Sequence, residues 1–137
     1  MWESEDLGSR EILWTSTTFL AGFSRHRQAP CGALTAALIC LGLRYRCPPE
    51  DKKQAAKGRE AAGRDAHVLV ESFQNKYGSI SCQDLIGIDF SDPDSIRRWL
   101  ENEMWSQTCD AYVSYIVAQL YDLAESRPAG TENVPSP

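Results

Sequence analysis

The feature that most constrains the fold is an apolar stretch, CGALTAALICLGL, which runs from Cys31 to Leu43 without a charged residue. Small and aliphatic side chains occupy nearly all of its positions, which is typical of a helix that is buried on every side. The stretch is well short of the roughly 20 apolar residues that a membrane-spanning helix needs. It therefore predicts a central, buried helix in a small helical protein.

Further helices are predicted on both sides of this stretch. Apolar residues at steps of three and four precede Gly78, a typical helix stop, and Asp92-Pro93 is a typical helix start. Ser81 and Asp84 form a weak capping-box pattern for a single-turn helix that Gly87 closes. The predicted helices span residues 11–20, 31–43, 49–77, 82–86, 93–104 and 108–123. Because no segment favours a strand, the predicted fold class is all-α, a small single-domain helical bundle of about five to six helices.

The chain is predicted to have three parts around a single core. Residues 1–18 form an N-terminal segment that is expected to be partly ordered or a short helix. Residues 19–126 form the predicted helical domain, which contains all five cysteines. Residues 127–137 include the sequence PAGTENVPSP, whose proline, glycine and polar content is typical of a disordered tail.

The charge and the termini limit the classes of partner. A formal net charge of −5 gives no general attraction to nucleic acid or to anionic lipid. The acidic start MWESEDLG lacks the basic region of a signal peptide, so we expect a cytoplasmic protein without membrane insertion. Glycine-rich phosphate loops and Ser-His-Asp signatures are also missing from the sequence.

The cysteines are the main indication of function, because thiols in the reducing cytosol are usually free, metal-bound or redox-cycling. Cys31, Cys82 and Cys109 each fall in the first turn of a predicted helix, where free N–H groups and the helix dipole favour a thiolate. Thiolates attack disulfides and bind metals. We therefore predict that these three cysteines converge on one site, as catalytic thiols, as metal ligands, or both.

The other candidate ligands have simpler explanations. Cys40 lies in the middle of the apolar stretch and is expected to fill the core, whereas Cys47 is expected to be a surface thiol. His26 and His67 more often serve exposed or packing roles than metal binding. The sequence contains no CxxC pair, which disfavours thioredoxin-type and zinc-ribbon sites.

Two motifs together with Cys109 resemble a known family. The first is CGALTA, beginning at Cys31 and followed by LGLRY, and the second is YGSISCQDLIG, which spans residues 77–87. In this order and spacing they are similar to the C_GCAxxG_C_C family, over about residues 19–123. The family is described by four cysteines, one of them in a CGAxxG motif, and its members are small helical proteins often encoded near transporter genes. A related domain in split-Soret cytochromes carries an iron–sulfur cluster, so the resemblance implies a shared cysteine site.

This sequence departs from the family pattern at two points. Ala36 replaces the last glycine of CGAxxG, and the family's first cysteine has no counterpart before Pro30. Zinc and iron–sulfur centres usually have four ligands, so three matched thiols would need a fourth ligand from His26, Cys40, Cys47, water or a partner chain.

Three functions are therefore predicted. The first is a redox-active or metal-binding protein in which Cys31, Cys82 and Cys109 hold an iron–sulfur cluster or another thiolate-bound metal, or act as a dithiol with a resolving thiol. The second is a metal-free thiol–disulfide carrier that exchanges electrons with a redox partner protein. The third is a degenerate helical interaction module. A homo-oligomer would provide a route to the missing ligand, and no nucleic-acid partner is expected.

Overall fold

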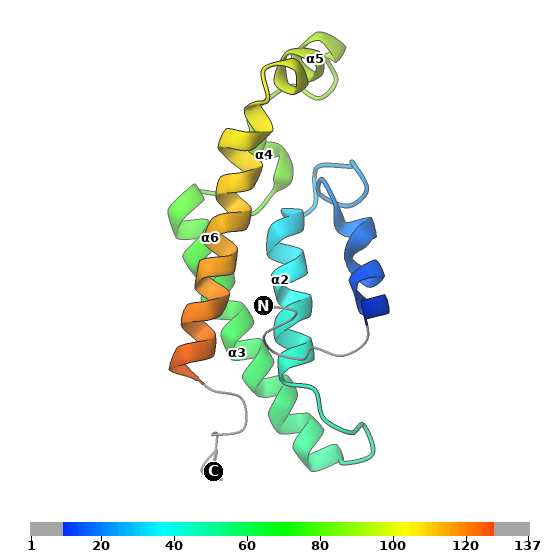
Figure 1. Ribbon diagram of the computed structural model, residues 1–137, viewed down its shortest axis with the longest axis vertical. Coiled ribbons are helices and arrows are strands. Elements are labelled where there is room, and N and C mark those ends of the chain that lie inside the picture. The colour runs from blue at the N-terminus through cyan, green and yellow to red at the C-terminus, as the bar shows by residue number, and fades with distance from the viewer. Residues whose placement is uncertain (1–9, 128–137) are drawn as a thin grey trace.

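In the computed structural model, which describes residues 10–127, the apolar stretch forms the central helix α2 (Gly32–Arg44). One side of α2 contacts α6, and another contacts the N-terminal 3-10 helix η1 (Figure 1). The other described elements follow the predicted order: η1 (Arg10–Phe19), α3 (Lys52–Tyr77), α4 (Cys82–Ile86), α5 (Pro93–Glu101) and α6 (Met104–Ser126). No strand occurs within residues 10–127, which confirms the all-α fold class.

The core lies where α2, α3 and α6 meet. Each helix contributes buried residues at spacings of three and four, which place them on one face. Phe73 of α3 is completely buried, and its ring contacts the rings of Tyr77 and Tyr112, which also contact each other. The buried core residues are Leu34, Ala37, Leu41, Leu69, Phe73, Tyr112, Ile116 and Leu120.

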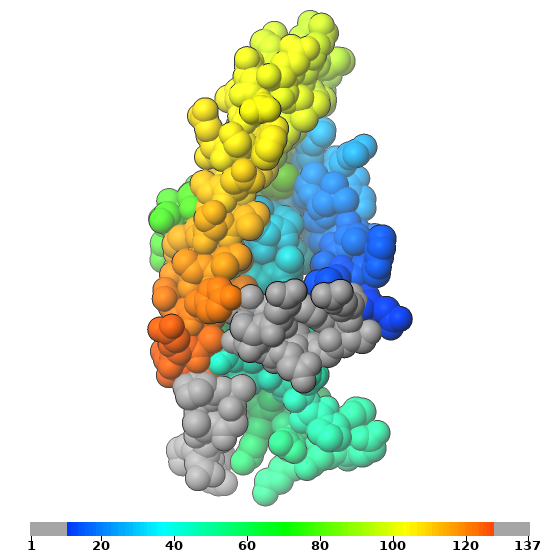
Figure 2. Space-filling view, in the orientation of Figure 1, coloured from blue at the N-terminus to red at the C-terminus, as the bar shows by residue number. Residues whose placement is uncertain are grey.

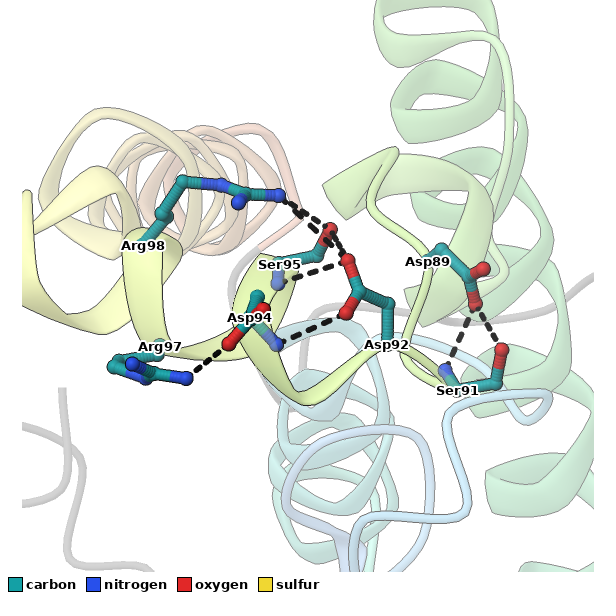
Figure 3. A network of polar contacts seen from close by, with 7 residues as sticks. All are labelled: Asp89, Ser91, Asp92, Asp94, Ser95, Arg97 and Arg98. Atoms are coloured by element: carbon teal, nitrogen blue, oxygen red, sulfur yellow. Dashed lines mark hydrogen bonds and ion pairs between the residues drawn. The ribbon is translucent and has the colours of Figure 1, made fainter.

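Two predicted helix boundaries are confirmed by the backbone, and a third is displaced. As predicted, α3 stops at Gly78, which is left-handed, but it begins at Lys52 rather than at residue 49, after the N-cap Asp51, which accepts a hydrogen bond from the Gln54 amide. Asp92 caps α5 by accepting bonds from the amides of Asp94 and Ser95, as Figure 3 shows. These bonds satisfy amides that have no partner inside the helix.

The capping pattern at α4 differs from the prediction. Ser81 occupies the N-cap position, but its side chain makes no capping bond. Instead the Ser79 hydroxyl donates to the Asp84 carboxylate and accepts from the Ser81 amide. The residue two positions earlier therefore supplies the polar contacts that the pattern assigned to Ser81.

The boundary between α5 and α6 also differs. The predicted helices ran to Met104 and started again near Thr108, whereas α5 ends at Glu101 and α6 begins at Met104. Glu103 takes a left-handed conformation, with φ of +49°, and turns the chain between the two helices. As a result α5 and the start of α6 project beyond the ends of α2 and η1 (Figures 1 and 2).

Hydroxyl side chains bond back to the main chain along the N-terminal 3-10 helix η1. Thr15, Ser16 and Thr17 each donate to the carbonyl three residues earlier. This spacing coincides with the three-residue repeat of a 3-10 helix. The segment predicted for residues 11–20 is therefore helical but more tightly wound than an α-helix.

A buried carboxylate joins the far end of α6 to the bundle. Asp65 of α3 is 1% exposed, accepts a hydrogen bond from the Tyr45 hydroxyl at 2.5 Å, and forms an ion pair with Arg127. Arg44 donates to the carbonyls of Ala124 and Arg127.

Residues 128–137 of the predicted tail and residues 1–9 of the N-terminal segment lie outside the described residues. Among the helices of residues 10–127, none has the length and apolarity required to cross a bilayer.

Candidate cysteine site

Main-chain hydrogen bonds bring Cys31 and Cys82 together. The Cys31 amide donates to the Ile80 carbonyl at 2.8 Å, and the Cys82 amide donates to the Ala29 carbonyl at 3.1 Å. Between these bonds, Pro30 and Ser81 form an isolated antiparallel bridge. The beginnings of α2 and α4 therefore lie side by side, although their cysteines are far apart in the sequence.

Cys109 reaches the same region from α6. An ionised thiol at Cys31 or at Cys109 would raise the pKa of Cys82, and Cys31 acts in the same way on Cys109. All three thiols also act electrostatically on the hydroxyl of Tyr112. The structure therefore brings the three predicted cysteines within electrostatic range of one another, while their chemical role stays a prediction.

A loop from Leu20 to Ala29 covers Cys82, which is 6% exposed. Gly22 lies so close that a Cβ atom there would be 2.7 Å from the Cβ of Cys82. The backbone is left-handed at Ala21, Gly22, Phe23, Ser24, Arg25 and Arg27. Such conformations are costly for residues with a Cβ, so they persist only where surrounding contacts fix them.

Two contacts of Arg27 hold this loop in place. Its carbonyl accepts a hydrogen bond from the amide of Gln83, the residue after Cys82, at 2.8 Å. Its guanidinium lies 3.7 Å from the centre of the Phe90 ring. The loop is therefore fixed on both sides of α4.

The glycine of the CGA motif allows η1 to approach α2. A Cβ atom on Gly32 would lie 3.0 Å from the Phe19 carbonyl oxygen and 3.4 Å from the Cα of Leu20. A side chain at this position would push the end of η1 away from the helix that Cys31 begins. The motif thus places the covering loop close to the site.

Burial dominates the electrostatics of the site. It raises the pKa of Cys82 from its ordinary 9.0 to about 11, with smaller contributions from Cys31 and Cys109, and the opposing effect of Arg27 is smaller still. Burial also raises the pKa values of Cys109 and Tyr112. The expectation that helix ends favour the thiolate is therefore wrong for Cys82 and Cys109.

The helix positions explain part of this result. Cys31 is the N-cap residue of α2, and Cys82 begins a helix of only five residues. Cys109 lies in the second turn of α6, because that helix begins at Met104 rather than near Thr108. The field of a helix dipole is strongest at the terminal turn, so Cys109 lies beyond it.

The remaining candidate ligands lie elsewhere or face outward. Cys40 follows Cys31 by nine residues, about 13 Å along the axis of α2, and Cys47 lies beyond the opposite end of that helix. His26 and His67 are exposed, and His67 pairs with Glu71 at 3.4 Å. None of the five cysteines, all of which lie within residues 10–127, forms a disulfide.

The arrangement does not fit a preformed metal centre. Within residues 10–127, no three His, Cys, Asp or Glu side chains are grouped so that they could hold a metal ion. A bound metal takes cysteine as the thiolate, so metal binding here would release the proton that Cys82, with its raised pKa, holds at neutral pH. The site as it stands is a cluster of three thiols.

Sequence reasoning missed three residues of this region, namely Gly22, Arg27 and Tyr112. Tyr112 follows Cys109 by one helical turn, and its hydroxyl donates to the Leu85 carbonyl at 2.7 Å. The spacing of three residues between Cys109 and Tyr112 could have indicated this, because residues three apart lie on the same face of a helix. The contacts of Gly22 and Arg27 depend on the left-handed loop, which no local sequence pattern predicted.

One family model matches the chain. It is described as "Putative redox-active protein (C_GCAxxG_C_C)" and matches residues 3–123, most of the 137-residue sequence. No curated protein and no solved structure shows significant similarity to the chain.

Proposed function

The chain belongs to the C_GCAxxG_C_C family, and from this premise we propose that it is a thiol-dependent redox protein acting through Cys31, Cys82 and Cys109. The proposal is supported by the main-chain bonds that place Cys31 beside Cys82, and by the electrostatic effects that Cys31 and Cys109 exert on Cys82. Free cysteines that only fill a core have no need to gather in this way.

The proposed reaction is thiol–disulfide exchange with a partner protein. A thiolate of the site attacks a disulfide of the partner and forms a mixed disulfide, which releases one partner thiol. A second site thiol then attacks the mixed disulfide, so that the site becomes a disulfide and the partner becomes a dithiol. Two electrons and two protons pass from the site to the partner.

The three thiols differ in their exposure to solvent, and we propose different roles for them on that basis. Cys31 is partly exposed at the N-cap of α2, so its thiol is accessible to the disulfide of a partner protein. Cys82 is buried and protonated, so it is suited to act second, after the covering loop moves or the mixed disulfide forms. We therefore assign Cys31 as the attacking thiol, with Cys82 and Cys109 as resolving thiols.

Metal binding by the same three cysteines is the second candidate; it is supported by the family description and by the electrostatic effects of Cys31 and Cys109 on Cys82, and it requires the three side chains to come closer than they are in this structure. It requires the deprotonation of Cys82 and a fourth ligand, for which a second copy of the chain is one source. The interaction-module alternative gives the cysteines no shared role, and the electrostatic effects of Cys31 and Cys109 on Cys82 count against it. The proposed setting is the cytoplasm, with a disulfide-bearing protein as the partner.

The test is to equilibrate the full chain in glutathione buffers and to map its disulfides by differential alkylation and mass spectrometry. We expect a disulfide between two of the three site cysteines. Replacing Cys31 by serine should abolish reduction of a disulfide-containing protein substrate, whereas Cys47→Ser should leave it unchanged. Site thiols that stay reduced in oxidising buffer would overturn the proposal. Stoichiometric iron and sulfide after anaerobic expression would favour metal binding instead.

A further inference from the structure

Tyr112 joins the two helices that carry Cys82 and Cys109. Its hydroxyl donates to the Leu85 carbonyl of α4 at 2.7 Å. Leu85 follows Cys82 by three residues, and Tyr112 follows Cys109 by three residues. A single hydrogen bond therefore links the turn after one cysteine to the turn after the other.

The ring of Tyr112 is fixed by the core. The residue is 8% exposed, and its ring makes edge contacts with Tyr77 at 4.7 Å and with Phe73 at 5.8 Å between centroids. Because the ring cannot move freely, the position of its hydroxyl is set by the packing of α3 and α6. The short helix α4 is held at that position through Leu85.

The other thiol pair is held by different bonds. Cys31 and Cys82 are tied by main-chain bonds on both sides of the Pro30–Ser81 bridge, and these bonds do not involve Tyr112. The spacing between Cys31 and Cys82 and the spacing between Cys82 and Cys109 therefore depend on separate contacts.

We propose that Tyr112 is a positioning residue that sets the spacing between Cys82 and Cys109 through its hydrogen bond to Leu85. This inference rests on the proposed thiol–disulfide function, because it specifies which thiols of that site can pair. Pairing of Cys82 with Cys109 uses a disulfide as the oxidant: glutathione disulfide takes up two electrons and two protons and leaves as two glutathione molecules.

The decisive variant is Tyr112→Phe, which removes only the hydroxyl. The matched control is Tyr115→Phe, one turn further along α6, whose hydroxyl bonds Ser72 of α3 rather than α4. The ratio of disulfide to dithiol is measured at a fixed glutathione ratio. For the Cys82–Cys109 pair the measurement uses a Cys31→Ser background. For the Cys31–Cys82 pair it uses a Cys109→Ser background.

Tyr112→Phe should lower the ratio for Cys82–Cys109 by up to about fivefold, because α4 would no longer be held with its thiol near Cys109 and the energy of one hydrogen bond sets the upper limit of the effect. The ratio for Cys31–Cys82 and both ratios in Tyr115→Phe should stay unchanged. A Cys82–Cys109 ratio in Tyr112→Phe that is unchanged or higher, or an equal fall in both pairs, would overturn the inference.

Hydrogen exchange separates failure of this inference from failure of the proposed function. In Tyr112→Phe the amides of Leu85 and Gly87, which bond within α4, should exchange faster, and in Tyr115→Phe they should not. If the amides exchange faster in Tyr112→Phe but the unsubstituted chain forms no site disulfide, the redox function is rejected, and with it the role of Tyr112 in thiol pairing. Normal exchange in a chain that does make both disulfides would reject Tyr112 alone.

Discussion

Gly22 and Cys82 are in such close contact that the loop has no room for a side chain over the thiol. A Cβ atom on Gly22 would lie 2.7 Å from the Cβ of Cys82 and 2.8 Å from the Ala29 carbonyl oxygen. The loop can cover Cys82 only while the position is glycine, because the backbone there is also left-handed, with φ of +57°. The exposure of Cys82 is therefore controlled by a residue 60 positions earlier in the chain.

Gly22→Ala should destabilise the fold and expose Cys82. The left-handed conformation alone costs about 1–2 kcal/mol for alanine, and the steric overlap adds about 1–3 kcal/mol. Gly78→Ala is the matched control, since Gly78 is also left-handed but has nothing within 4 Å of its Cβ position. Urea unfolding and the rate of Cys82 alkylation measure the two effects, and equal losses of stability in both variants would contradict the close contact.

Alkylation of Cys82 should depend on pH differently in the folded and unfolded chain. A pKa near 11 rather than 9.0 leaves about one hundredth as much thiolate at pH 8, so the folded thiol should react about a hundredfold more slowly than in urea. The folded rate should keep rising toward pH 11. Mass spectrometry of the peptide that contains Cys82 measures the rate, and a plateau below pH 9 would show that burial does not control this thiol.

The same shift predicts how stability changes with pH. The folded pKa of Cys82 lies above the unfolded value, so the stabilisation from the buried neutral thiol is complete below about pH 9. It should be lost progressively as the pH rises from about 9 to about 11. Comparison of the free energy of unfolding of the unsubstituted chain and Cys82→Ala across this range isolates the effect. A parallel decline in both proteins would assign the loss to other groups.

Arg127→Ala should cost far more stability than Arg97→Ala. Loss of Arg127 leaves the carboxylate of Asp65, which is 1% exposed, without its ion-pair partner, and such losses cost about 3–5 kcal/mol. Arg97 pairs with Asp94 on the solvent-exposed surface of α5, as Figure 3 shows, and that pair contributes at most about 1 kcal/mol. Thermal unfolding of both variants tests this difference. Equal melting temperatures would mean that the tyrosine hydroxyl of Tyr45 is enough for Asp65.

Phe73→Ala should be among the most destabilising single substitutions. Phe73 has no exposed surface and contacts the rings of Tyr77, Tyr112 and Tyr115. Its removal leaves a cavity in the core, at a cost of about 3–5 kcal/mol. Val113→Ala, at a residue of α6 that is 48% exposed, should cost under about 1 kcal/mol, and calorimetry of the two variants measures the difference.

The parts of the fold that could be predicted are those determined by neighbouring residues. The apolar run of α2, the left-handed stop at Gly78 and the start at Asp92-Pro93 are local patterns, and the structure contains each of them. The turn between α5 and α6 was missed although Asn102, a residue typical of turns, is the C-cap of α5, because the left-handed residue itself is Glu103, and glutamate rarely takes that conformation. The position of Cys109 within α6 was wrong for the same reason.

In the candidate site, too, the features set by local sequence could be predicted and those set by tertiary contacts could not. The three cysteines were selected from motifs and from the predicted starts of helices, and the structure places them near one another. Their protonation depends on burial by the loop that carries Gly22, which is a contact between residues distant in the sequence. The electrostatics of the site therefore followed from tertiary packing rather than from the helix ends that the sequence indicated.

The bridge between Pro30 and Ser81 has one more consequence. Because peptide groups rather than side chains join the two chain segments there, the main-chain alignment of Cys31 with Cys82 does not depend on contacts between the side chains of Pro30 and Ser81. A polypeptide can thus exchange or lose one of its sulfur-bearing positions and still present the neighbouring pair in register, ready to be reused for a different reaction.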